Sequence, residues 1–203
     1  MPAETSASDS ALARLGHTLY QRALVRREDE PITDPRGQPI GWLLDTRTPM
    51  LDGAVCQEAG AVLAERLRSR GITQVAGFGY GSFPIVCAVT AQPDETPFRG
   101  GFVRERRKAY GRRRLVEGPL DRSQPVALVD DILNSGRSAA RAVALLRADG
   151  FKVAGVLTLF NFTWSGGRAR LEADGLWVES LLELNLRESG RSGTTSGDTT
   201  ARS

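Results

Sequence analysis

Apolar residues along the chain follow two periods, one typical of buried strands and one typical of amphipathic helices. Continuous apolar runs predict strands at 42–45, 74–79, 126–130 and 153–160. Apolar residues at helical spacing predict helices at 11–25, 53–70, 84–90 and 138–149. Because the two kinds of segment alternate and the strands are apolar throughout, the sequence predicts an α/β fold, with a mostly parallel, twisted sheet and helices on both faces.

The length of 203 residues predicts a single domain with a substantial core. Residues 1–10 are small and polar, and we expect a flexible N-terminus there. The domain is expected to span 11–188. Residues 189–203 are rich in Ser, Gly and Thr and bury too little apolar surface to order themselves, so a disordered tail is predicted.

Composition narrows the class of protein. A net charge of +3 gives only weak bulk attraction to nucleic acid. Cys56 and Cys87 form no close-spaced pair and are expected to be reduced core residues of a cytoplasmic protein. His17 is the single histidine, so no zinc site is indicated. The sequence shows neither a secretion signal nor an apolar run of membrane-spanning length.

The segment 126–138 combines an apolar strand, two carboxylates and a polar turn that leads into a helix. Asp130 and Asp131 close the apolar run, and a turn containing glycine follows at 134–138. A helix N-terminus stabilises phosphate through unpaired amides and the helix dipole. Adjacent carboxylates accept hydrogen bonds from vicinal hydroxyls or hold a cation. The pattern indicates a sugar phosphate site; the plain alternative is a strand end followed by a helix N-cap.

This segment resembles the binding motif for PRPP (5-phosphoribosyl 1-diphosphate) of type I phosphoribosyltransferases. The resemblance implies that Asp130 and Asp131 bind the ribose hydroxyls. It assigns the 5-phosphate to the residues of the turn, which are Asn134, Ser135, Gly136, Arg137 and Ser138. Asn134 and Arg137 stand where threonines are common in the family, so the serines, the backbone amides and the charge of Arg137 are expected to hold the phosphate.

The segment 72–84 is similar to the strand and pyrophosphate-binding loop of the same family. Its glycines let backbone amides approach a diphosphate, and Pro84 suits a first helical turn. The resemblance assigns Tyr80, Gly81 and Ser82 to the diphosphate. By itself, the segment is more typical of a common glycine-rich turn between a strand and a helix.

Residues 102–119 resemble the mobile catalytic loop of the orotate phosphoribosyltransferase branch. Matched position by position, Arg104 and Lys108 keep the basic residues of the branch, Tyr110 stands at a histidine and Glu105 replaces a lysine. An isolated basic run is by default a solvated face or an RNA-binding arm. Here glycines on both sides of the run favour a flexible, hinged lid.

The resemblance implies catalytic roles for Lys108, Arg104 and Asp131. The first two are also expected to contact the diphosphate when the lid closes.

The residues expected to form the base pocket differ from those of the orotate phosphoribosyltransferase branch. Trp42 lies in a segment that resembles the part of the branch that packs on the base. Phe162 stands where the branch has an arginine that contacts the orotate carboxylate, and it cannot pair with an anion. Arg36, displaced by one position from a carboxylate-binding lysine, is the candidate substitute. The PRPP half of the site is therefore kept better than the orotate half.

The resemblance implies transfer of a 5-phosphoribosyl group from PRPP to a ring nitrogen of a pyrimidine or related heterocycle, with release of diphosphate. It implies Mg²⁺ as cofactor, with no side-chain metal site assigned, and a homodimer. Two alternatives stay open: a non-catalytic PRPP- or nucleotide-binding regulator with the same fold, and an RNA- or DNA-binding protein that uses the arginine-rich segment.

Overall fold

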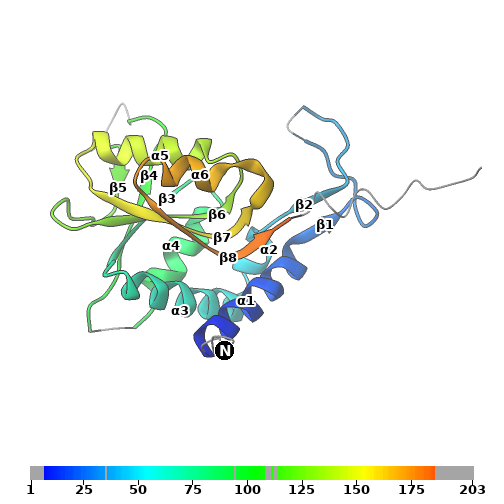
Figure 1. Cartoon of the computed structure of the whole chain (residues 1–203), viewed down its shortest axis with the longest axis horizontal. Coiled ribbons are helices and arrows are strands. Elements are labelled where there is room, and N and C mark those ends of the chain that lie inside the picture. The colour runs from blue at the N-terminus through cyan, green and yellow to red at the C-terminus, as the bar shows by residue number, and fades with distance from the viewer. Residues whose placement is uncertain (1–6, 35, 94, 108–110, 112–113, 186–203) are drawn as a thin grey trace, which may run out of the picture.

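One six-stranded sheet covered by helices on both faces forms the body of the molecule, and a small hairpin lies beside it (Figure 1). The structure is a computed structural model that describes residues 7–34, 36–93, 95–107, 111 and 114–185, and the backbone alone for 7–13. The predicted α/β class with a mostly parallel sheet is confirmed.

The sheet has the strand order β5-β4-β3-β6-β7-β8. In chain order its strands are β3 (Gln74–Phe78), β4 (Arg99–Val103), β5 (Val116–Glu117), β6 (Val126–Leu133), β7 (Val153–Phe162) and β8 (Trp177–Leu184). All neighbours pair in parallel except β4 and β5. The carboxyl ends of the five parallel strands therefore meet at one edge, where such sheets bind ligands.

Helices lie above and below this sheet (Figure 1). One face carries α1 (Ala7–Ala23), α2 (Arg47–Met50), α3 (Gly53–Ser69) and α4 (Ser82–Thr90). The other carries α5 (Arg137–Ala148) and α6 (Gly167–Glu172), which the 3₁₀ turn η1 (Thr163–Ser165) precedes. The hairpin pairs β1 (Leu24–Arg26) with β2 (Trp42–Leu44). Within the described ranges, no helix has the length and apolar character needed to cross a membrane.

Two apolar clusters, one on each face of the sheet, make up the core. Successive residues of β6 alternate between them: Ala127 and Val129 pack toward α3 and α4, and Val126 and Leu128 pack toward α5. Burial on both faces explains why this strand is apolar at every position before Asp130.

Several helices and strands begin or end at other residues than the sequence predicted. Strand β6 continues to Leu133, because its ladder with β7 extends to the pair Leu133–Asn161, so the acidic pair lies within the strand and not after it. Helix α1 begins at Ala7 and ends at Ala23, so part of the N-terminus expected to be flexible is helical. Residues 1–6 and the predicted tail at 189–203 lie outside the described part of the chain.

Seven elements were not predicted from the sequence: β1, α2, β4, β5, η1, α6 and β8. Strand β8 lies at an edge of the sheet and mixes glutamates with apolar residues, which hides the apolar run. Strand β4 contains two adjacent glycines, which are usually typical of a turn.

Helix α5, which leads out of the polar turn, depends on one buried face. We expect Leu146→Ala to lower the free energy of unfolding by about 2–4 kcal/mol, because Leu146 is fully buried. The neighbouring Leu145 is only partly buried, and Leu145→Ala should cost about 1 kcal/mol or less. Urea denaturation of both variants measures the difference; equal losses would contradict the assigned face.

Candidate active site

The carboxylate of Asp131 joins three segments at the carboxyl edge of the sheet. Its Oδ2 accepts a hydrogen bond of 2.5 Å from the hydroxyl of Thr46, which lies just after β2. Its Oδ1 accepts from the backbone N–H of Ile132 at 2.9 Å. A Cβ at Gly81 would overlap this carboxylate. Gly81 lies in the turn after β3, which we call the glycine turn. The hairpin, β6 and the glycine turn therefore meet at one side chain.

Asp130 lies on the other side of the strand, because neighbouring residues of a strand point to opposite faces. It lines a cavity of about 70 Å³ together with the turn at 134–138. Burial, and next the charge of Asp131, raise the pKa of Asp130 to about 8. At neutral pH this carboxyl group holds a proton, and the two acidic residues present different hydrogen-bonding groups.

The five residues predicted to hold a phosphate are brought together in that cavity: Asn134, Ser135, Gly136, Arg137 and Ser138. Gly136 adopts a left-handed conformation with φ of 70°, which reverses the chain directly before α5. Its carbonyl accepts the first helical hydrogen bond, from Ala140. The amides of the first turn of α5 are therefore without helical partners, which is the arrangement that suits an anion.

The segment before and within α6 supports this turn from behind. Ser165 Oγ donates to the carbonyl of Asn134 at 2.6 Å, and Arg170 Nε donates to the carbonyl of Ser135 at 3.0 Å. Gly167 packs so closely on Asn134 that a side chain there would overlap the carbonyl. Sequence reasoning missed these contacts, because they join residues more than 30 positions apart.

The turn after β3 and the basic segment share a second cavity, of about 710 Å³, at the ends of β3 and β4. Tyr80 and Arg104 both line it. Tyr80 is 81% exposed, and its ring lies 5.6 Å from the ring of Phe83. The Arg104 guanidinium lies 3.8 Å from the Glu117 carboxylate. Lys108, like the rest of 108–110 and 112–113 in the predicted lid, lies outside the described residues.

The assignment of Ser82 to the diphosphate rests on backbone amides and stays a prediction; the structure shows where its side chain lies. Its side chain is fully buried, and its hydroxyl donates to the carbonyl of Gly79 at 2.7 Å. Ser82 therefore shapes the turn from inside, and its hydroxyl is not presented to a ligand. Gly81 is half-buried against Asp131, as described above.

An aromatic wall, which we define as Trp42, Phe162 and Trp164, lies at the end of β7. The ring of Phe162 meets Trp42 edge to face, with centroids 5.8 Å apart, and stacks on Trp164 at 4.7 Å. Phe162 is 8% exposed, so it forms the inner ring of the wall. Arg36 lies in an exposed turn of the segment between β1 and β2, which projects from the body (Figure 1).

The segment after β2 also holds an ion pair that the sequence did not reveal. Asp45 Oδ1 lies 2.8 Å from Arg47 Nε, and the hydrogen bond from Arg47 lowers the pKa of Asp45. Thr46 between them is buried, at the N-cap of α2. A threonine before a short helix is typical of an N-cap, which gives no sign of its bond to Asp131.

Known proteins resemble the chain over most of its length. It is 31% identical to an orotate phosphoribosyltransferase of Rhodopirellula baltica, covering 87% of this chain and 95% of the relative. The crystal structure of the Mycobacterium tuberculosis orotate phosphoribosyltransferase with Fe(III) dicitrate is 28% identical, with a TM-score of 0.74 over 86% of this chain and 97% of that one. The complex of that mycobacterial protein with PRPP shares the fold, with a TM-score of 0.66 and 24% identity over 86% of this chain and 90% of that one. No family model matches.

The raised pKa of Asp130 predicts a pH-dependent stability. The carboxyl group ionises near pH 4 in the unfolded chain and near pH 8 in the native one, so the native state binds the extra proton between these values. Its contribution to stability therefore falls as the pH rises from 4 to 8. Asp130→Asn removes this dependence. Urea denaturation at pH 5 and pH 9 should show the wild type losing about 1 kcal/mol or more relative to the variant; parallel losses would contradict the assignment.

Proposed function

The chain belongs to the orotate phosphoribosyltransferase family, and from this premise we propose how it transfers the 5-phosphoribosyl group of PRPP to a ring nitrogen of a pyrimidine or related heterocycle. Family membership confirms the enzyme class predicted from the sequence, a PRPP-dependent pentosyltransferase that releases diphosphate. The comparisons give no support to a non-catalytic regulator. One observation supports the residue roles. The acidic pair, the turn at 134–138 and the glycine turn all lie at the carboxyl edge of the sheet.

The sugar phosphate is assigned to β6 and the turn after it. Asp130 and Asp131 bind the ribose hydroxyls, one as a neutral acid and one from beside Gly81. The residues of the turn, Asn134, Ser135, Gly136, Arg137 and Ser138, hold the 5-phosphate through amides, hydroxyls and the charge of Arg137.

Strand order supports a direction for the reaction. The ribose site on β6 lies between β3, which leads into the glycine turn, and β7, which ends at the aromatic wall. Inversion at C1 requires the acceptor nitrogen to attack from the side opposite the leaving group. With diphosphate at the end of β3, the acceptor base belongs at the end of β7, against Trp42 and Phe162.

Negative charge that builds on the leaving diphosphate is stabilised from the cavity at β3 and β4. Gly79, Tyr80 and Arg104 line this volume, and the Glu117 carboxylate lies 3.8 Å from the Arg104 guanidinium. We assign Lys108 to the closing lid. Catalysis then consists of positioning, charge stabilisation and exclusion of water from the activated sugar.

Asp131 fits the predicted Mg²⁺ as a single carboxylate ligand. Magnesium is usually held by one or two carboxylates, waters and substrate phosphates, not by a cage of side chains. Asp131 provides such a carboxylate beside the proposed PRPP site, and the described residues contain no cluster of three or more acidic, Cys or His side chains. When bound with PRPP, the ion would neutralise charge on the diphosphate.

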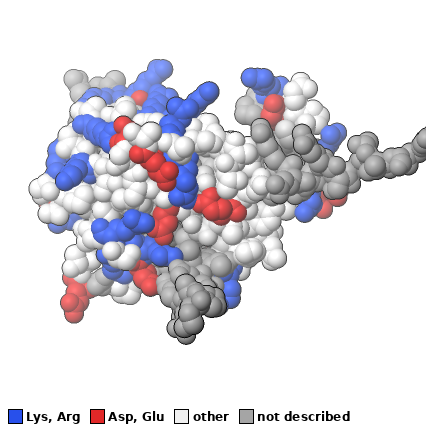
Figure 2. Space-filling view, viewed as in Figure 1, with Lys and Arg blue, Asp and Glu red and all other residues white. Residues whose placement is uncertain are grey.

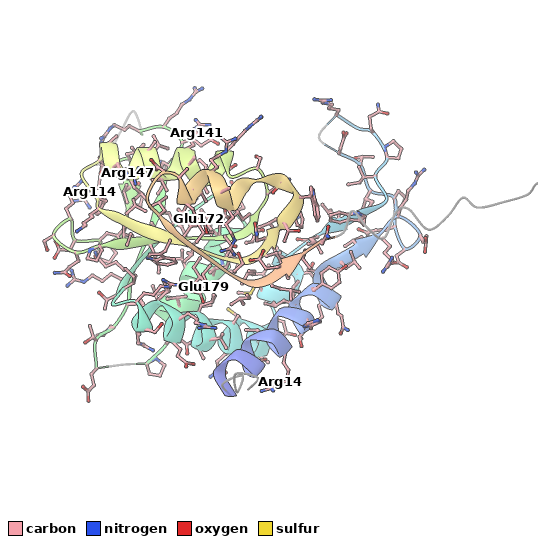
Figure 3. The ribbon with its side chains drawn as sticks, viewed as in Figure 1. Arg14, Arg114, Arg141, Arg147, Glu172 and Glu179 are labelled. Atoms are coloured by element: carbon pink, nitrogen blue, oxygen red, sulfur yellow. The ribbon has the colours of Figure 1, made fainter. Side chains whose placement is uncertain are left out.

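A homodimer stays a prediction from the resemblance, and a cytoplasmic location stays a prediction from the cysteine pattern. Nucleic-acid binding is disfavoured by the charge pattern, since basic and acidic side chains are interspersed on the face in view (Figure 2). Arg141 and Arg147, which stand on α5 (Figure 3), lie 3.9 Å from Glu105 and 2.5 Å from Asp174. Paired arginines leave less charge for a phosphate backbone.

Removing both carboxylates tests the sugar site. We expect Asp130→Asn combined with Asp131→Asn to weaken PRPP binding at least about tenfold, since the charge-assisted hydrogen bond lost at Asp131 alone contributes about 1.5 kcal/mol or more. Isothermal titration calorimetry measures the affinity, and circular dichroism checks that the variant folds. Asp121→Asn is the control, because Asp121 lies at the amino end of β3, where its backbone N–H donates to Gln74. Unchanged affinity in the double variant would remove the assignment.

The chain contains two lysines, which allows a matched test of the lid. Lys108→Ala should slow diphosphate release roughly 30-fold or more, because one lost charge contact in a transition state costs about 2–4 kcal/mol, and should weaken PRPP binding much less. Lys152→Ala is the control. Steady-state kinetics with a reactive base measures both variants, and equal rates would mean that Lys108 is not catalytic.

A further inference from the structure

We infer that Thr46 is a positioning residue for PRPP, because its hydroxyl holds the Asp131 carboxylate in the orientation that receives the ribose. The inference deepens the proposed function and rests on it, since it requires Asp131 to contact the sugar. No role for Thr46 was predicted from the sequence.

The Thr46 hydroxyl does not serve the helix that Thr46 precedes. Thr46 is the N-cap residue of α2, and a threonine at this position normally accepts a hydrogen bond from an amide of the first turn. Its side chain makes no such bond, and its backbone is right-handed (φ −63°, ψ −21°). Asp45 caps the turn instead, because its Oδ1 accepts from the backbone N–H of Arg47 at 3.2 Å. The hydroxyl of Thr46 is therefore available for a distant partner.

This distant partner is the Asp131 carboxylate. Thr46 Oγ1 donates to Asp131 Oδ2 at 2.5 Å, across 85 positions of the chain. Thr46 is 2% exposed, so water does not compete for the bond. Hydrogen bonds from a hydroxyl to a carboxylate are short and roughly twice as strong as those between neutral groups. A buried bond of this kind holds the carboxylate in one orientation.

Two donors hold the Asp131 carboxylate, one at each oxygen. The backbone N–H of Ile132 donates to Oδ1 at 2.9 Å, and Thr46 donates to Oδ2. An ionised carboxylate has about four acceptor positions, so each oxygen keeps capacity for a hydroxyl group or an ion. Without the Thr46 hydroxyl, the carboxylate is free to turn about its Cβ–Cγ bond, a torsion with little intrinsic preference. The ribose would then meet an acceptor in several orientations.

The fold fixes Thr46 before any ligand binds. The backbone N–H of Asp45, on one side, donates to the carbonyl of Ala23 at 2.8 Å. On the other side, the backbone N–H of Met50 donates to the carbonyl of Thr46 at 3.1 Å, and both Pro49 and Met50 are buried. The hydroxyl is thus preorganised by packed elements, as a residue that supports a binding site needs to be.

Replacing Thr46 tests this role, because valine removes the hydroxyl and keeps the branched shape of the side chain. Titration calorimetry of Thr46→Val with PRPP and Mg²⁺ should show affinity reduced at least about tenfold. Thr46→Ser keeps the hydroxyl and should stay within about threefold of the wild type. Thr48→Val is the matched control, because the hydroxyl of the exposed Thr48 donates to Asp45 Oδ2 at 3.4 Å.

The inference is overturned if folded Thr46→Val binds PRPP as the wild type does, or if Thr46→Ser loses as much affinity as Thr46→Val. Thermal denaturation checks that each variant folds. Thr46→Ala, which removes the same hydroxyl from a smaller side chain, replaces the valine variant if that one does not fold.

A double-mutant cycle separates positioning through Asp131 from a general loss of structure. Diphosphate release with PRPP, Mg²⁺ and orotate gives kcat/KM for PRPP. Thr46→Val should lower this value at least about tenfold in the wild-type background, and by less than about twofold in the Asp131→Ala background, where the acceptor is gone. Equal factors in the two backgrounds would show that Thr46 acts independently of Asp131, and would overturn the inference.

The wild-type protein distinguishes failure of the inference from failure of the proposed function. Failure of the wild type to bind PRPP contradicts the proposed function itself. PRPP binding that Thr46→Val leaves unchanged contradicts only the inference.

Discussion

The Asp131 carboxylate is the point on which the geometry of the site depends. It receives the Thr46 hydroxyl at 2.5 Å and leaves no room for a side chain at Gly81. These contacts connect the segment that follows β2, the strand that carries the acidic pair and the turn that leads into α4. A site that handles sugar, diphosphate and base needs all three segments in register, and one side chain is in contact with each of them.

The order of the parallel strands sets where the sugar, the diphosphate and the base lie in the proposed site. Because β6 lies between β3 and β7, a sugar held at Asp130 and Asp131 has the glycine turn on one side and the aromatic wall on the other. The turn after β6 is the proposed site of the 5-phosphate, and Ser165 supports it through a hydrogen bond to Asn134. With the proposed residue roles, the fold separates the leaving group from the acceptor, which is the arrangement that an inverting transfer requires.

The sequence predicted what is local and missed what is distant. The apolar run into Asp130 and the turn before α5 are contiguous, so their strand, turn and helix could be predicted from pattern alone. The bond from Thr46 to Asp131 spans 85 positions and leaves no trace in either segment. Serine is a common ligand residue, and only the packed structure shows that the Ser82 hydroxyl donates to the carbonyl of Gly79. Edge strand β8 was missed because its polar side chains interrupt the apolar pattern.

We propose that PRPP binds only when Asp131 keeps its place between Gly81 and Thr46. Gly81→Ala tests it most directly, because the backbone there is right-handed (φ −64°) and accepts alanine without strain, while the new methyl group displaces the carboxylate. Titration calorimetry with PRPP and Mg²⁺ should show affinity reduced about tenfold or more, with the melting temperature nearly unchanged. Affinity within about twofold of the wild type in the folded variant would contradict the account.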